Sequence, residues 1–77
     1  MDGKKLVRMA NQIADFFASG TDHRAAVEGV AGHLQKFWEP RMRKKILAMV
    51  DAGTTDGMAP LVLEALRAHR VQIEPQG

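Results

Sequence analysis

The sequence contains no cysteine and no tyrosine, and aromatic residues make up only 5% of it. Without cysteine the chain cannot form disulfides, thiolate nucleophiles, zinc fingers or cysteine-ligated iron–sulfur clusters. No apolar run approaches the ~18 residues of a membrane-spanning helix. The amphipathic N-terminal segment also lacks the continuous apolar stretch of a secretory signal. We therefore expect a protein that is neither membrane-spanning nor secreted.

The chain has 77 residues, a formal net charge of +2 and an apolar content of 45%. This composition is typical of a globular protein, and the length predicts one domain over residues 1–77. A chain of this size buries only about 60% of the surface that it exposes when unfolded, so its own stability is marginal. Because the chain has no disulfides or cysteine-bound metals to stabilise it, we expect oligomerisation or a larger partner to add to its stability.

Apolar residues recur at helical spacing in four segments, whereas the period-2 alternation of strands is absent. Asp2 is the candidate N-cap of the first segment, and Thr21 or Asp22 of the second. Pro40 and Pro60 suit the first turns of the third and fourth. The sequence thus predicts an all-α fold, a small bundle of four short helices, with loose termini outside residues 4–68. The predicted helices span about 4–18, 24–38, 40–50 and 58–68.

The apolar faces predict which side chains are buried. Phe16 and Phe17 share the apolar face of the first segment, and Phe37 and Trp38 share that of the second. The opposite side of the second segment carries Ala25, Gly29 and Gly32. Such small residues permit close approach of another backbone, although a loosely packed surface helix explains them equally well. A helix tolerates interior glycine at a cost of about 1 kcal/mol relative to alanine.

No combination of residues predicts catalysis on this chain. The three histidines lack metal-ligand spacing such as H-x-x-x-H, and no P-loop, G-x-S-x-G or dinucleotide-binding motif occurs. We interpret His33, at the edge of an apolar face, as a packed histidine with a satisfied ring nitrogen. The sequence therefore predicts no catalytic, cofactor-binding or metal-binding residues.

The most informative segment is 36–45, which carries five basic residues and two aromatic ones around Glu39-Pro40. Helix N-termini favour acidic residues, yet this helix opens with Arg41 and Arg43. Such an arrangement can bind a carboxylate or a phosphate, but an intramolecular ion pair or plain solvation remains an alternative. The basic residues do not form one stripe, which argues against nucleic-acid binding. Trp38 is either an interface anchor or a core residue.

Several runs of residues, in this order and spacing, resemble one known family. The similarity covers about residues 4–68. The family is the delta subunit of soluble NAD-dependent formate dehydrogenase. The runs that carry the resemblance are KLVRMANQI (5–13), FF (16–17), HL (33–34), KFW (36–38), PRMR (40–43), PLV (60–62) and AL (65–66).

The resemblance implies a small accessory subunit of a bacterial cytoplasmic complex that oxidises formate and reduces NAD. In such complexes the large alpha subunit holds a molybdenum (or tungsten) bis-pterin guanine dinucleotide centre and iron–sulfur clusters. Other subunits carry FMN, further clusters and the NAD site. The delta subunit carries no redox cofactor, and its implied role is the assembly, stability or cofactor maturation of the alpha subunit.

The resemblance also marks shared positions, of which Phe37 and Trp38 are expected in the core. The expected partner is the large molybdenum-containing subunit. A small basic nucleic-acid-binding module, or a homo-oligomer of the isolated chain, is the alternative. A variant of the first hypothesis has the basic segment 36–45 binding a nucleotide or pterin phosphate. The predicted partner-binding residues are Arg8, Asn11, Gln12, His33, Trp38, Arg41 and Arg43.

Overall fold

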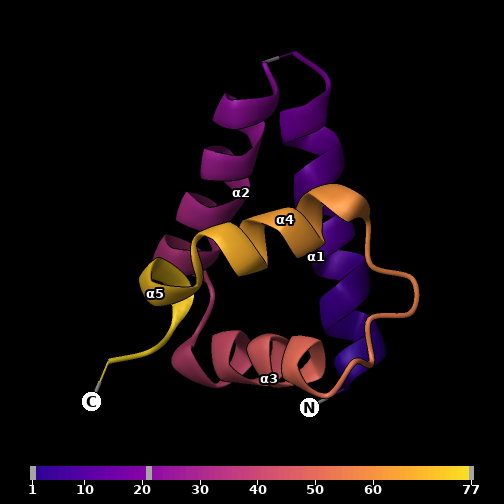
Figure 1. Cartoon of the computed structure of the whole chain (residues 1–77), viewed down its shortest axis with the longest axis vertical. Helices are drawn as coiled ribbons and strands as arrows, with labels where there is room; N and C mark the ends of the chain where they lie inside the picture. The colour runs from indigo at the N-terminus through magenta and orange to yellow at the C-terminus, as the bar shows by residue number, and fades with distance from the viewer. Residues whose placement is uncertain (1, 21, 77) are drawn as a thin grey trace.

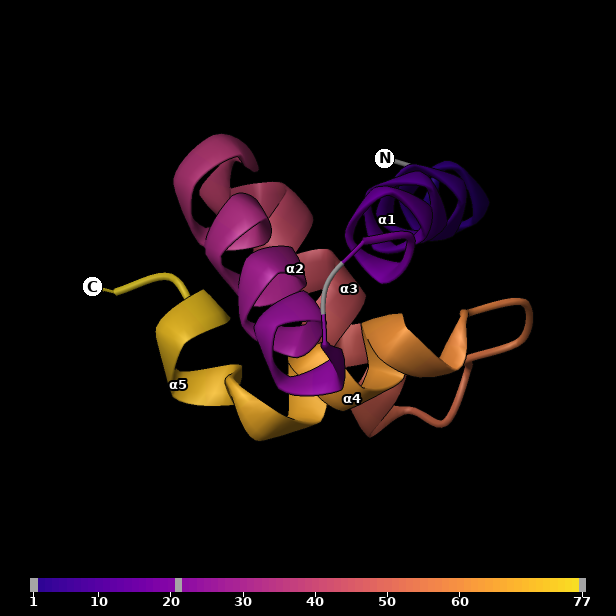
Figure 2. The same cartoon turned by 90° about the horizontal axis from the view of Figure 1, so that it is seen from above.

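The computed structural model describes residues 2–20 and 22–76, and within these ranges every regular element is a helix. The all-α prediction is confirmed. Two antiparallel helices, α1 and α2, stand side by side, α4 crosses them, and α3 lies across one end (Figure 1). Figure 2 shows that α4 and α5 form a layer on one side of the α1–α2 pair. The helices are α1 (Gly3–Ala18), α2 (His23–Phe37), α3 (Pro40–Asp51), α4 (Pro60–Ala68) and α5 (Arg70–Ile73).

Helix starts follow the local sequence. The carboxylates of Asp2 and Asp22 accept hydrogen bonds from first-turn backbone N–H groups at 3.0 and 2.8 Å, respectively. These bonds satisfy donors that a helix leaves unpaired, and they confirm both residues as N-caps. Thr21, the alternative cap, lies outside the described residues. The other two long helices begin at Pro40 and Pro60, where the missing N–H is of no consequence.

The core is assembled from all five helices and contains no charged residue among those described. Trp38 is 6% exposed and belongs to this core, as predicted. Its backbone is extended (φ −86°, ψ 135°), so the chain turns at the end of α2 and directs the indole inward. The largest fully buried side chains are Leu34, Ile46, Leu66, Ile73, Val30 and Val62.

Two predicted core positions are wrong. Phe37 is 72% exposed and Phe16 is 74% exposed. The apolar arcs of α1 and α2 are wider than the surface that the other helices cover. On α1, full burial is confined to the sector of Leu6, Val7, Ala10 and Ala14. Periodicity identifies an apolar arc, but packing decides how much of it is buried.

A fifth helix was not predicted. The chain bends at His69 (φ −117°, ψ 32°) and then forms one more turn, α5, which ends at Ile73. The Ile73 side chain is fully buried and closes the core. Helical structure thus extends beyond residue 68. Four residues are too few to produce a periodic signal, which is why the sequence did not reveal this helix.

No helix in the described part of the chain is both long and apolar enough to cross a lipid bilayer.

Candidate interaction surface

A groove of about 480 Å³ runs between α1 and α2 and is mostly apolar. Three residues predicted to bind a partner, Gln12, His33 and Trp38, line it. Neither α4 nor α5 contributes to it. The remaining lining residues are Met9, Ile13, Phe16 and Phe17.

Aromatic contacts build the two walls of the groove. On the α1 side, the rings of Phe16 and Phe17 meet edge to face with centroids 5.2 Å apart. On the α2 side, the imidazole of His33 packs against Phe37 with centroids 4.8 Å apart. The predicted packing of His33 is thus confirmed, while no hydrogen bond joins its ring to another residue within 2–20 and 22–76, and neither ring nitrogen is buried without a partner. The Phe37 ring is inclined at 42° to the imidazole.

The small residues of α2 are only partly used for close packing. A Cβ added at Gly29 would lie 2.4 Å from Cδ1 of Phe17, so the Phe17 ring occupies the space that a side chain would need. A Cβ at Gly32 would meet nothing within 4 Å. The close neighbour at Gly29 is therefore a side-chain ring of the same chain and not another backbone, while Gly32 remains open.

Asn11 fastens the long loop between α3 and α4 to α1. Its Nδ2 donates to the carbonyl of Gly57 at 2.8 Å, and its Oδ1 accepts from the backbone N–H of Ala59 at 2.9 Å. Gly57 has a positive φ of 83°, which favours glycine at this turn. Arg8 lies one turn earlier on α1 and is exposed. Together with Asn11 and Gly57 it lines a hollow beside the loop. Asn11 thus has a structural role that its place on the polar face of α1 did not reveal.

The basic start of α3 divides into inward and outward residues. Arg43 is half-buried, and its guanidinium donates to the carbonyls of Trp38 at 3.2 Å and Ile73 at 3.0 Å. These carbonyls belong to the C-terminal ends of α2 and α5, where helices leave acceptors unpaired and carry partial negative charge. Arg43 therefore links two helix ends through carbonyls rather than through a carboxylate. Arg41 is exposed and forms no ion pair with any described residue.

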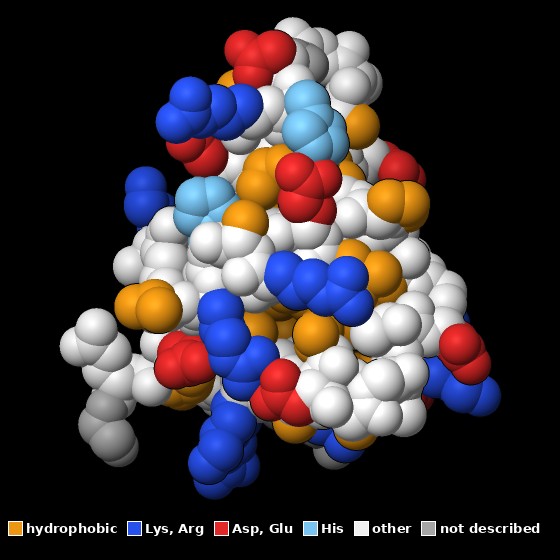
Figure 3. All heavy atoms as spheres, in the orientation of Figure 1, with side chains coloured by type: hydrophobic (Ala, Val, Ile, Leu, Met, Phe, Trp, Pro, Cys, Tyr) orange, Lys and Arg blue, Asp and Glu red, His pale blue; other side chains and the backbone are white. Residues whose placement is uncertain are grey.

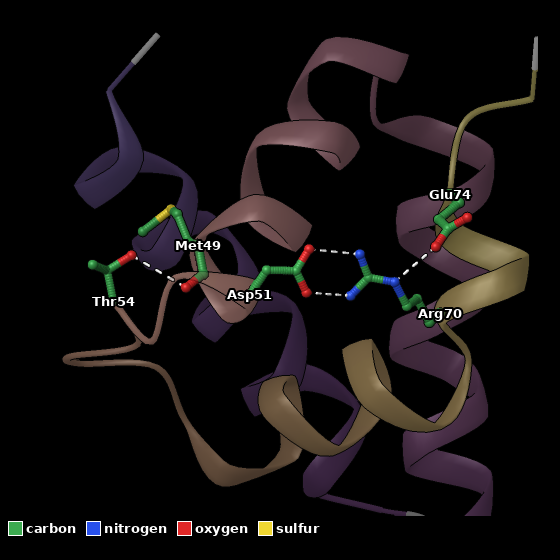
Figure 4. Close-up of polar contacts among 5 residues, drawn as sticks. All are labelled: Met49, Asp51, Thr54, Arg70 and Glu74. Atoms are coloured by element: carbon green, nitrogen blue, oxygen red, sulfur yellow. Dashed lines mark hydrogen bonds and ion pairs between the residues drawn. The ribbon is translucent and has the colours of Figure 1, made fainter.

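An ion-pair network that the sequence analysis missed joins the end of α3 to α5 (Figure 4). Both terminal nitrogens of Arg70 bond to the carboxylate of Asp51 at 2.7 Å, and its Nε bonds to Glu74 at 2.7 Å. The hydrogen bonds from Arg70 hold the pKa of Asp51 below its usual value. The Asp51 and Glu74 carboxylates in turn raise the pKa of Arg70. Only the i, i+4 spacing of Arg70 and Glu74 was visible in the sequence.

On the face that carries α4 and α5, acidic and basic side chains are interspersed, and no surface of a single sign dominates (Figure 3). On this face, Nε2 of His23 on α2 lies 2.7 Å from a carboxylate oxygen of Glu64 on α4. No three His, Asp or Glu side chains in the described ranges come together as a metal-binding group.

Comparison with known families identifies the family of the chain. Residues 5–66 match the family model of the NADH-dependent formate dehydrogenase delta subunit, FdsD. The chain belongs to this family. No curated protein and no solved structure matches it. The matched segment contains both walls of the groove, the Asn11 contacts and the basic start of α3, whereas α5 lies beyond it.

Proposed function

We propose that this chain is a non-catalytic accessory subunit that docks on the large molybdenum- or tungsten-containing subunit of a cytoplasmic NAD-dependent formate dehydrogenase. There it supports assembly, stability or cofactor maturation of that subunit. Membership of the FdsD family over residues 5–66 is the observation that carries the proposal. The absence of cysteine from the sequence supports it, because the iron–sulfur clusters then belong to other subunits.

The predicted partner-binding residues divide into two groups on this proposal. Arg8, Gln12, His33 and Arg41 offer polar groups with no hydrogen bond to the described chain. We assign these to direct contact with the large subunit. The other three positions, Asn11, Trp38 and Arg43, shape the surface through bonds and packing inside the subunit.

Co-expression of the complex with and without this chain tests the proposal. The large subunit carries an affinity tag, and native mass spectrometry reports the composition of the complex before and after metal insertion. We expect this chain to co-purify with the large subunit, and its omission to lower the metal content, the formate-dependent reduction of NAD or the melting temperature. A complex that never contains the chain, and that keeps all three properties without it, would overturn the proposal.

Charge reversal tests the assigned contacts. Arg41→Glu should weaken co-purification, because an exposed guanidinium is replaced by a carboxylate. Arg67→Glu is the matched control, since Arg67 is also exposed but lies on α4. Arg43→Glu is unsuitable, because it also breaks two hydrogen bonds within the subunit. Equal binding of the two variants would remove Arg41 from the interface.

A further inference from the structure

Two large aromatic side chains at and beside the groove between α1 and α2 are exposed to solvent. Phe16, on the α1 wall, and Phe37, in an adjoining hollow that shares Phe17 and His33 with the groove, expose most of their surface. A fully exposed phenylalanine offers roughly 200 Å², so the two rings alone present on the order of 300 Å² of apolar surface. Patches of this size on small soluble proteins are commonly binding sites.

We propose that this groove receives an amphipathic helix of the large catalytic subunit, with acidic residues flanking its apolar face. The proposal rests on the function proposed above and specifies the chemistry of the partner segment.

The backbone of the groove favours a helix over an extended strand. Both walls are α-helices, whose interior N–H and C=O groups are already paired, so a strand would find no backbone partners there. A helix satisfies its own backbone and needs only an apolar surface. From Met9 to Phe17 the α1 wall is about 12 Å long at 1.5 Å per residue. This length accommodates about two helical turns, with apolar anchors at i, i+3 or i+4, and i+7.

The charges beside the groove select an acidic partner. Lys5 lies in the same helical row as Met9 and Phe16, at spacings of four and eleven residues. Lys36 lies beside Phe37 on the α2 side. Both lysines are exposed, and neither forms an ion pair with the described residues. The nearby acid, Glu28, already faces Arg24 at 3.9 Å.

These lysines also argue against a second copy of this chain as the occupant. A two-fold dimer through the groove would bring the same cationic rim from each copy to one interface. Like charges at an interface oppose association, whereas acidic flanks on a different chain would complement them.

Binding of the full-length chain to the tagged large subunit tests the apolar contacts. The double variant F16D/F37D should weaken binding by roughly tenfold or more, since exposed aromatic anchors dominate such interfaces. V71D is the matched control, because Val71 is 84% exposed but lies on α5. Circular dichroism should show unchanged helix content in both variants, because the replaced side chains lie outside the core.

A second pair of variants tests the charges. K5E/K36E should weaken binding and reduce its dependence on salt, because two attractive ion pairs become repulsive. R67E, which reverses a charge at an exposed site on α4, should bind like the unmodified chain. A photo-crosslinking amino acid at position 16 should attach to an acidic-flanked helix of the large subunit.

The outcomes separate this inference from the proposed function. If the unmodified chain binds the large subunit and F16D/F37D binds equally well, the groove is not the contact and only this inference fails. A crosslink to a second copy of the chain, or to a strand, would also overturn it. If the unmodified chain does not bind the large subunit at all, the proposed function itself fails.

Discussion

Gly29 and Gly32 lie about one turn apart on α2, and replacing each with alanine should have opposite effects on stability. Alanine raises helix propensity by about 1 kcal/mol at either position. At Gly32 the new methyl group meets nothing within 4 Å, so Gly32→Ala should stabilise the protein by about that amount. At Gly29 the methyl group would lie 2.4 Å from Cδ1 and 2.6 Å from Cε1 of Phe17.

The cost at Gly29 follows from these distances. Carbon atoms in contact are normally about 3.5–4.0 Å apart, so the Phe17 ring must move by about 1 Å. Overpacking of this kind costs about 1–3 kcal/mol. It cancels or exceeds the gain in helix propensity, so Gly29→Ala should be neutral or destabilising by up to about 2 kcal/mol. The gap between the two variants is then the overpacking cost itself, or at least about 4 °C in melting temperature for a domain of this size.

Urea and thermal unfolding followed by circular dichroism measure this gap. The decisive control is a background carrying Phe17→Ala, in which the obstructing ring is absent. There, Gly29→Ala and Gly32→Ala should stabilise the protein about equally, and the double-mutant cycle should give a coupling energy between positions 17 and 29 of about 1–3 kcal/mol. Equal stability of the two variants in the unmodified chain, or a gap that persists without the ring, would refute the reasoning.

Three further predictions concern polar contacts. Asn11→Ala should lower the free energy of unfolding by about 1–3 kcal/mol, because it removes two hydrogen bonds to the loop; an unchanged urea midpoint would contradict this. Arg43→Met should cost about 2 kcal/mol in the same assay, whereas Arg41→Met at the exposed neighbouring site should stay within about 0.5 kcal/mol; similar losses would show that the inward bonds contribute nothing. The pKa of Asp51 is lowered by Arg70, so the stability from this ion pair is present above about pH 4 and is lost as the pH falls through the depressed pKa. Stability measured against pH should therefore decline less steeply below pH 4 in Asp51→Asn, and parallel curves would show that the pair does not stabilise the fold.

Several residues of the candidate surface could be identified from the sequence, but the sequence did not show which apolar residues are buried and which line the groove. Gln12, His33 and Trp38 were singled out from the sequence, and the structure brings them to one groove. Phe16 was assigned to the core and instead forms a wall of that groove. Since apolar character alone does not distinguish a core residue from a binding residue, the sequence could not separate the two.

The amino-acid sequence by itself determined the four longer helices, the side-chain caps of two of them and the family. These depend on local features: apolar periodicity, a carboxylate such as Asp2 or Asp22 before a first turn, and proline at a helix start. Each of these features involves residues within a few positions of one another. The family match likewise depends only on the order of residues along the chain.

The tertiary structure alone decided which side chains pack within the subunit and which remain exposed for a partner. The contact of Phe17 with Gly29, the inward turn of Arg43 and the pairing of Asp51 with Arg70 join residues 12 to 30 positions apart. Their formation depends on the angles at which the helices cross, and those angles follow from the packing of whole helix faces. The local sequence around each residue does not predict that packing.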